Sequence, residues 1–234
     1  RFHTHNAGSV LTAQQPLNNA VRVTWQALSA ILGGTQSMAC CAYDEALALP
    51  TEASATLALR TQQMLALESG ITDTIDPLAG SYYVEALTDK MEKEAMEYIE
   101  KIDKMGGAVA AIEQGYMQGE MAAHAYQYQK DIEDGRFTVV GVNKYTDNKA
   151  IGKQENVVVD LTVAERQIKH TNEIKAKRDQ KAVDKALADL KKACEGTENT
   201  MPYLIAAVKT YATLGEICGV MKEVFGEYKS SSAF

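Results

Sequence analysis

Two short polar segments constrain the fold of this chain most, because each stands between a strand pattern and a helix pattern. The first, residues 3–8, precedes a helix that Pro16 can open. The second, residues 44–50, lies between a buried-strand pattern over 35–43 and a helix that Thr51 can cap. In barrels of alternating strands and helices, the carboxyl ends of the strands carry the chemistry. We therefore expect site residues in these two segments.

Two strand–helix units are too few to close a barrel, because eight are needed to pair every strand edge and fill the interior. The other strands must come from another chain or from a preceding part of the protein. The chain also opens on Arg1, inside a strand pattern and without a methionine, which indicates the back part of a larger protein. The expected fold class is α/β, namely the last strand–helix units of a (β/α)8 TIM barrel followed by a mostly α-helical extension.

Beyond Gly70 the pattern changes to helices. Asp89 and Glu92 are spaced as a capping pair for a helix that ends at Gly106. Val139–Val142 reads as one additional strand. Further helices are predicted over 108–114, 118–134, 162–194, 199–212 and 214–225, the last with Thr213 and Glu216 as its capping pair.

These patterns predict the following organisation. A barrel portion covers residues 1–88, a helical extension packing on it covers 89–145, a linker covers 146–156, a C-terminal helical region covers 157–228, and a tail covers 229–234. Within 175–195, a stripe of apolar residues faces mixed charges, which is typical of a solvated amphipathic helix or of a docking face for a partner subunit. The stripe comprises Val183, Leu187, Leu190 and Cys194.

Composition limits the classes of partner. The 234 residues carry a net charge of −7, whereas a surface for nucleic acid or anionic membrane needs clustered Lys and Arg. No apolar run approaches the roughly 20 residues that cross a bilayer, and the first residues show no signal-peptide pattern. We expect a cytoplasmic protein without nucleic-acid or membrane partners. The cysteines show no Cys-x-x-Cys spacing, so we expect free buried thiols; they are Cys40, Cys41, Cys194 and Cys218.

His3 and His5 are two residues apart, so both imidazoles leave the same face of an extended segment. They could be hydrogen-bonded side chains in a polar cavity. They could also bind a metal, which would need further ligands. If the two strands are neighbours, these could come from the end of the second strand and the segment after it, namely from Cys40, Cys41, Asp44 or Glu45. We assign no metal site on this pattern alone.

Other residues of the two segments suit a bound ligand. Gly8 permits the close approach of a large ring or an unusual backbone angle. Asp44 and Glu45 form an acidic pair after a strand, where a carboxylate can accept hydrogen bonds from ligand hydroxyls or stabilise a helix start. Gln36 could contact substrate, support such a contact, or serve the fold alone.

An ordered series of motifs resembles the methylmalonyl-CoA mutase family. The resemblance covers roughly residues 1–228 and corresponds to the last part of the large-subunit barrel with the helices behind it. Related mutases acting on isobutyryl-CoA or 2-hydroxyisobutyryl-CoA share most of the motifs. They are His3–Gly8, Leu11–Asn19, Gly33–Ser37, Asp44–Thr51, Glu68–Gly70, Asp76–Tyr83, Met105–Gly107 and Val140–Tyr145.

The resemblance implies roles for particular residues. His3 and His5 would contact the corrin and the adenosyl group of adenosylcobalamin, although His5 stands where the family commonly has Gln. Glu45 would bind the ribose hydroxyls of the adenosyl group. Small residues would lie against the corrin ring, and these are Gly8, Ala46 and Ala48.

The implied activity is the radical isomerisation of an acyl-CoA, with (R)-methylmalonyl-CoA to succinyl-CoA as the leading case. The implied partners are the acyl-CoA substrate, a chain supplying the rest of the barrel, a cobalamin-binding small subunit and a G-protein chaperone. None of the four histidines lies in the Asp-x-His-x-x-Gly motif of the lower cobalt ligand, so we expect this chain alone to be inactive, and we assign it no catalytic residue. The alternatives are a non-catalytic scaffold or assembly subunit and, third, a His and Cys metal hydrolase.

Overall fold

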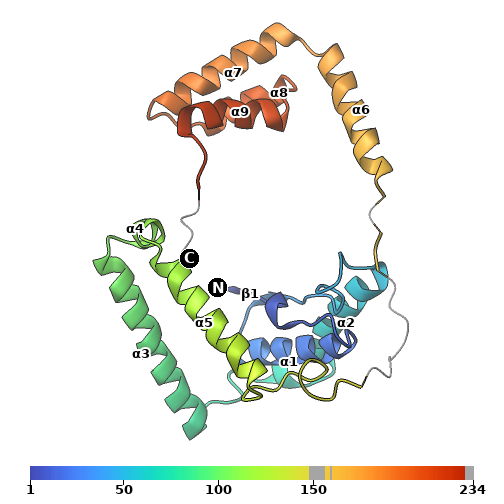
Figure 1. The fold of residues 1–234 in the computed structure, drawn as a ribbon, viewed down its shortest axis with the longest axis vertical. Coiled ribbons are helices and arrows are strands. Elements are labelled where there is room, and N and C mark those ends of the chain that lie inside the picture. Colours follow the sequence, from blue (N-terminus) through green and yellow to red (C-terminus); the bar gives the residue numbers. More distant parts are fainter. Residues whose placement is uncertain (148–155, 159, 230–234) are drawn as a thin grey trace. The chain divides into compact units, whose positions relative to one another are not determined.

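The computed structural model of the chain describes residues 1–147, 156–158 and 160–229. The chain divides into two units, with the boundary after residue 158, and Figure 1 shows their elements. Residues 148–155 of the predicted linker and 230–234 of the predicted tail lie outside the described residues.

The first unit contains a sheet of two parallel strands, β1 (His3–His5) and β2 (Ser37–Ala39). His3 stands opposite Ser37, and His5 stands opposite Ala39. The prediction of a strand over 35–43 was too long, because only three of those residues enter the ladder. The parallel pairing agrees with the predicted α/β class.

Two helices follow the strands, as predicted. α1 (Asn18–Leu32) connects β1 to β2, and its Val23 packs with Leu11 and Cys41 in a small core. α2 (Glu52–Leu67) packs on α1. Thr51 caps α2, because its hydroxyl accepts a hydrogen bond of 3.1 Å from the backbone N–H of Ser54. The polar segments after β1 and β2 are thereby held on one small framework.

Three helices follow: α3 (Tyr82–Lys104), α4 (Ala108–Glu113) and α5 (Tyr116–Glu133) (Figure 1). The predicted capping role of Asp89 and Glu92 was wrong, because α3 starts seven residues earlier. Its first turn is stabilised instead by Glu85, whose carboxylate accepts a hydrogen bond of 3.1 Å from the backbone N–H of Gly80. Local spacing of acidic residues did not distinguish a helix start from a solvated helix face.

The predicted strand Val139–Val142 was also wrong. A single bridge joins Val140 to Lys144 in a turn where Gly141 has a φ of +83°. The Asn143 side chain holds this turn, accepting from the N–H of Val139 at 2.8 Å and donating to the carbonyl of Phe137 at 2.7 Å. The apolar run is therefore a turn, because a side chain satisfies the backbone groups that a strand partner would need.

The second unit contains α6 (Thr162–Lys177), α7 (Gln180–Glu195), α8 (Met201–Lys209) and α9 (Leu214–Phe225). Thr213 and Glu216 form the predicted capping box of α9. The apolar stripe of α7 packs against α8 and α9, with Leu190 fully buried. The stripe therefore belongs to the core of this unit and is not a docking face for another subunit.

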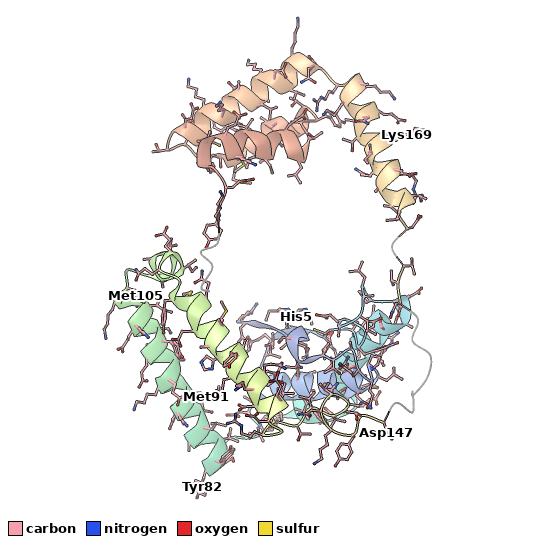
Figure 2. The ribbon with its side chains drawn as sticks, viewed as in Figure 1. His5, Tyr82, Met91, Met105, Asp147 and Lys169 are labelled. Atoms are coloured by element: carbon pink, nitrogen blue, oxygen red, sulfur yellow. The ribbon has the colours of Figure 1, made fainter. Side chains whose placement is uncertain are left out.

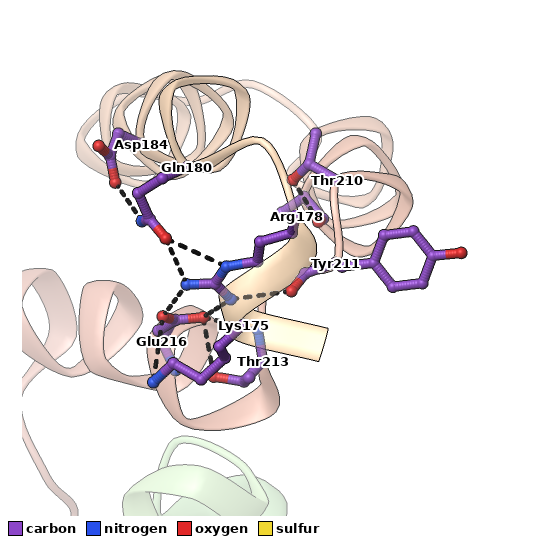
Figure 3. A network of polar contacts seen from close by, with 9 residues as sticks. Lys175, Arg178, Gln180, Asp184, Thr210, Tyr211, Thr213 and Glu216 are labelled. Atoms are coloured by element: carbon purple, nitrogen blue, oxygen red, sulfur yellow. Dashed lines mark hydrogen bonds and ion pairs between the residues drawn. The ribbon is translucent and has the colours of Figure 1, made fainter. Parts of the chain in front are cut away.

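The predicted single helix over 162–194 breaks at Arg178, whose backbone is extended. Asp179 then caps α7 with its side chain, which accepts from the N–H groups of Lys181 and Ala182. The Arg178 guanidinium is 2% exposed and donates to both carboxylate oxygens of Glu216 and to the carbonyl of Tyr211 (Figure 3). The break is fixed by contacts with residues more than 30 positions later in the chain.

Among the described residues, none of the helices is long and apolar enough to span a membrane.

Candidate functional site

Gly8 and Glu45, two of the residues singled out by the sequence, lie directly against each other. Gly8 begins a short 3-10 turn (Gly8–Val10) beyond β1, and Glu45 lies in a turn beyond β2. A Cβ atom on Gly8 would stand only 2.3 Å from Oε1 of Glu45. The Glu45 carboxylate therefore occupies the space that a side chain at Gly8 would need. The segments that follow the carboxyl ends of the two strands therefore lie against each other.

The two acidic residues of the second segment have different surroundings. Asp44 is 1% exposed, and its Oδ2 accepts a hydrogen bond of 3.2 Å from the backbone N–H of Thr51. Its backbone carbonyl accepts from the N–H of Ala48 at 3.1 Å. Asp44 thus holds the turn together, whereas Glu45 is exposed. Ala46 is exposed beside it and Ala48 is half-buried.

The two histidines both lie exposed on β1, and Figure 2 labels His5. Nδ1 of His3 lies 2.7 Å from the hydroxyl of Ser37 on β2. Nδ1 of His5 lies 2.8 Å from the backbone carbonyl of Asn6. Because a carbonyl oxygen only accepts, we assign the proton of His5 to Nδ1, which leaves Nε2 free for a ligand.

Cys41 lies beneath this site. Its Sγ is 3.3 Å from the carbonyl of Asn6 and 3.9 Å from Nδ1 of His5. Burial, reinforced by the neighbouring Glu45 carboxylate, raises the pKa of the Cys41 thiol to about 12. A thiol with this pKa stays protonated at neutral pH. No cluster of three or more His, Cys, Asp or Glu suited to a metal ion occurs in the described part of the chain, so the metal-hydrolase alternative gains no support.

The thiols should differ in reactivity toward a disulfide reagent at neutral pH. Cys218 is exposed, which corrects the expectation that all four cysteines are buried, and Cys40 is half-buried. We expect Cys218 to react first, whereas Cys41 and Cys194 react only after unfolding, because the thiolate is the reacting form and burial blocks access. Mass spectrometry of the modified peptides would measure this order. Rapid labelling of Cys41 in the folded protein would contradict it.

Gln36 lies at the opposite ends of the strands from Gly8 and Glu45. Its Oε1 accepts a hydrogen bond of 2.8 Å from the backbone N–H of Phe2, and its Nε2 donates to the carbonyl of Gly34 at 2.7 Å. Both ends of this side chain are thus bound to backbone groups that precede β1 and β2. The structure does not bring Gln36 together with the other candidates.

Sequence reasoning missed Asn19, which lies in the first turn of α1 and is completely buried. Its side chain forms hydrogen bonds with backbone groups of Thr12, which follows the first polar segment, and of Tyr43, which precedes the second. A signal was available, because an amide side chain in the first turn of a helix is well placed to bond a preceding loop. The spacing alone did not show which loops it reaches.

The geometry brings together groups that are suited to binding a ligand. An exposed carboxylate lies over a glycine, with small side chains beside it and a free imidazole nitrogen on the neighbouring strand. Such a carboxylate can accept hydrogen bonds from a pair of hydroxyl groups, and the small residues leave room for a flat ring. The residues present therefore fit a large ligand that carries a sugar.

Comparison with known proteins identifies the family. The model of the methylmalonyl-CoA mutase family matches residues 1–227, so this chain belongs to that family. The 2-hydroxyisobutanoyl-CoA mutase large subunit of Aquincola tertiaricarbonis is 44% identical over 100% of this chain, which covers 42% of that protein. Methylmalonyl-CoA mutase of Escherichia coli is 41% identical over 97% of the chain, and the human mitochondrial enzyme is 38% identical over 99%. The chain spans 32% and 31% of the lengths of these two enzymes.

Proposed function

We propose that this chain supplies part of the adenosylcobalamin-binding wall of an acyl-CoA mutase. The observation that carries the proposal is the exposed Glu45 carboxylate lying against Gly8 at the carboxyl ends of two parallel strands. Membership of the methylmalonyl-CoA mutase family and the names of its mutase relatives support the reaction class. The reaction would be the isomerisation of the carbon skeleton of an acyl-CoA.

The residues of this chain would bind and orient the cofactor. Glu45 would accept hydrogen bonds from the two ribose hydroxyls, which suits an exposed carboxylate. His5 would present Nε2 to the adenosyl group or to the corrin, and His3 would contact the corrin beside it. Small residues would allow the ring to approach the backbone, and these are Gly8, Ala46 and Ala48. Bound adenosylcobalamin would supply the radical chemistry, and this wall would help to exclude water from it.

A complete (β/α)8 barrel would require six further strands from the rest of the protein. Exposed apolar side chains on α1 support such an addition, since Trp25 is 65% exposed and Val21 is 50% exposed. The proposed partners are the remaining barrel, an acyl-CoA, a cobalamin-binding subunit and a G-protein chaperone. The activity would belong to that assembly. A cytoplasmic location stays a prediction.

For the substrate, we propose methylmalonyl-CoA first and 2-hydroxyisobutyryl-CoA or isobutyryl-CoA as alternatives. The relatives named as methylmalonyl-CoA mutases favour the first, and the relative at 44% identity favours the second. Assays of the assembled protein with each thioester would separate them.

Replacing Glu45 with Gln tests the proposed function directly. In the assembled mutase, E45Q should raise the KM for adenosylcobalamin about tenfold or more, because one carboxylate oxygen becomes an NH₂ group that cannot accept, and the bond to the other hydroxyl loses its charge. The KM for the acyl-CoA should change little. Glu52→Gln, an equally conservative change at an exposed residue at the start of α2, should leave both values unchanged.

The same pair of variants separates the enzyme from the scaffold alternative. A scaffold would bind its partners without contacting the cofactor, so an assembly whose cofactor affinity is the same for wild type, E45Q and E52Q would favour the scaffold. Native mass spectrometry should show equal assembly for all three proteins, which confirms that the comparison concerns cofactor binding alone.

A further inference from the structure

Asn19 uses its entire hydrogen-bonding capacity in a completely buried position. Its Oδ1 accepts from the backbone N–H of Thr12 at 3.1 Å and from Nη1 of Arg22 at 2.8 Å. Its Nδ2 donates to the carbonyl oxygens of Thr12 and Tyr43, each at 2.8 Å. A buried amide with four partners is held in one orientation, because any rotation leaves a polar group unsatisfied.

These bonds connect the two segments that form the candidate site. Thr12 follows Gly8 by four residues, and Tyr43 precedes Glu45 by two. One side chain therefore bonds to the backbone shortly after the first segment and directly before the second. Because the Glu45 carboxylate fills the space above Gly8, a small shift of either segment would separate them or force a collision.

Arg22 fixes the orientation of this amide. A guanidinium only donates hydrogen bonds, so the oxygen of Asn19 must face it and the NH₂ group must face the two carbonyls. Nη1 of Arg22 also donates to the hydroxyl of Thr12 at 3.0 Å, and Nη2 donates to the carbonyl of Val140 at 2.7 Å. The turn at 139–145 thus holds Arg22 in place by a hydrogen bond, and Arg22 in turn holds the side chain of Asn19.

We infer that Asn19 is a positioning residue that sets the register between the Gly8 and Glu45 segments, and that Arg22 supports it. Asn19 is completely buried, so it would act on the site through the backbone of Thr12 and Tyr43. The inference rests on the proposed role of Gly8 and Glu45 in holding the cofactor.

Asn19→Asp is the sharpest test, because it keeps the shape of the side chain and replaces the NH₂ donor by an oxygen that repels both carbonyls. In the assembled mutase, N19D should raise the KM for adenosylcobalamin about tenfold, the ratio expected if the displaced Glu45 loses one well-formed hydrogen bond to the cofactor. The KM for the acyl-CoA should stay within about twofold. A change confined to one KM distinguishes positioning from general destabilisation.

Asn18→Asp is the matched control, since it makes the same chemical change one residue away. The Asn18 side chain donates to Oε1 of Gln15 and to neither strand-end segment. N18D should leave the KM for the cofactor within about twofold of wild type. Equal effects of N18D and N19D would overturn the inference, as would a wild-type KM in N19D.

Arg22→Lys replaces N19D as the test if N19D does not assemble. Lysine cannot reach Asn19, Thr12 and Val140 together, so R22K should raise the same KM by a smaller factor. A wild-type KM in R22K would then overturn the inference. E45Q, measured alongside, separates a failure of the proposed function from a failure of this inference. A wild-type KM for adenosylcobalamin in E45Q contradicts the proposed function itself. A raised KM in E45Q with a wild-type KM in N19D contradicts only the role of Asn19.

Discussion

Replacing Gly8 with alanine is expected to weaken adenosylcobalamin binding by about tenfold or more while leaving the protein folded. The new methyl group would stand 2.3 Å from Oε1 of Glu45, so the carboxylate must move away. The φ angle of Gly8 is not positive, so an alanine at this position causes no backbone strain. The cost should appear in cofactor binding because Glu45 is an exposed, flexible side chain. The KM for the cofactor and the thermal midpoint, measured on the assembled mutase, would test both parts.

A double-mutant cycle shows whether Gly8 acts through Glu45. Once Glu45→Ala has removed the carboxylate, the methyl group at position 8 has nothing to displace. The double variant should therefore bind the cofactor about as weakly as E45A alone, and strict additivity would contradict the mechanism. Gly119→Ala is the control, since a Cβ there meets no atom within 4 Å.

Sequence patterns predicted the parts of the fold that depend on neighbouring residues. Thr51 caps α2 through Ser54, three residues away, and Thr213 and Glu216 close their capping box over the same spacing. The meeting of Gly8 and Glu45 was also predictable, because parallel strands bring their carboxyl ends to one edge. Each of these predictions follows from short spacing or from a topological rule.

The features that sequence reasoning missed depend on distant partners. Arg178 interrupts the predicted long helix because its guanidinium is bound by Glu216, 38 residues later, while the apolar periodicity continues through the break. Asn19 reaches Tyr43 across 24 residues. Local composition does not mark Arg178 or Asn19 as special, because an arginine in a charged helix and an asparagine near a helix start are both common in sequences.

Arg178 also carries the second large expected effect, on the stability of the second unit. Its side chain is 2% exposed and joins the end of α6 to the start of α9 through a two-point contact with Glu216. It also donates a hydrogen bond to the carbonyl of Tyr211, whose φ is +64°. Arg178→Met should leave the Glu216 carboxylate, which is 25% exposed, without its main partner, and removing one member of a partly buried pair costs more than removing one member of an exposed pair. Thermal unfolding of the second unit should therefore shift strongly downward.

Lys175 provides the matched control, because its Nζ lies 3.7 Å from Oε1 of the same Glu216 but its side chain is 45% exposed. Lys175→Met should change the free energy of unfolding by less than about 1 kcal/mol, as exposed ion pairs do. Equal shifts in the thermal midpoint for R178M and K175M would show that the two-point contact is not what holds the break between α6 and α7.

The Arg178–Glu216 pair should also make the second unit sensitive to acid. The Arg178 guanidinium, together with hydrogen bonds from Thr213, holds the pKa of the Glu216 carboxyl far below its ordinary value of 4.5. A carboxyl whose pKa is lower in the folded state stabilises the fold above its unfolded pKa, and that stabilisation is lost as the pH falls. The thermal midpoint of the wild type should therefore fall progressively below about pH 5. Glu216→Gln should be less stable at pH 7 and should show a flatter acid profile, whereas parallel profiles for the two proteins would assign the acid sensitivity to other carboxyl groups.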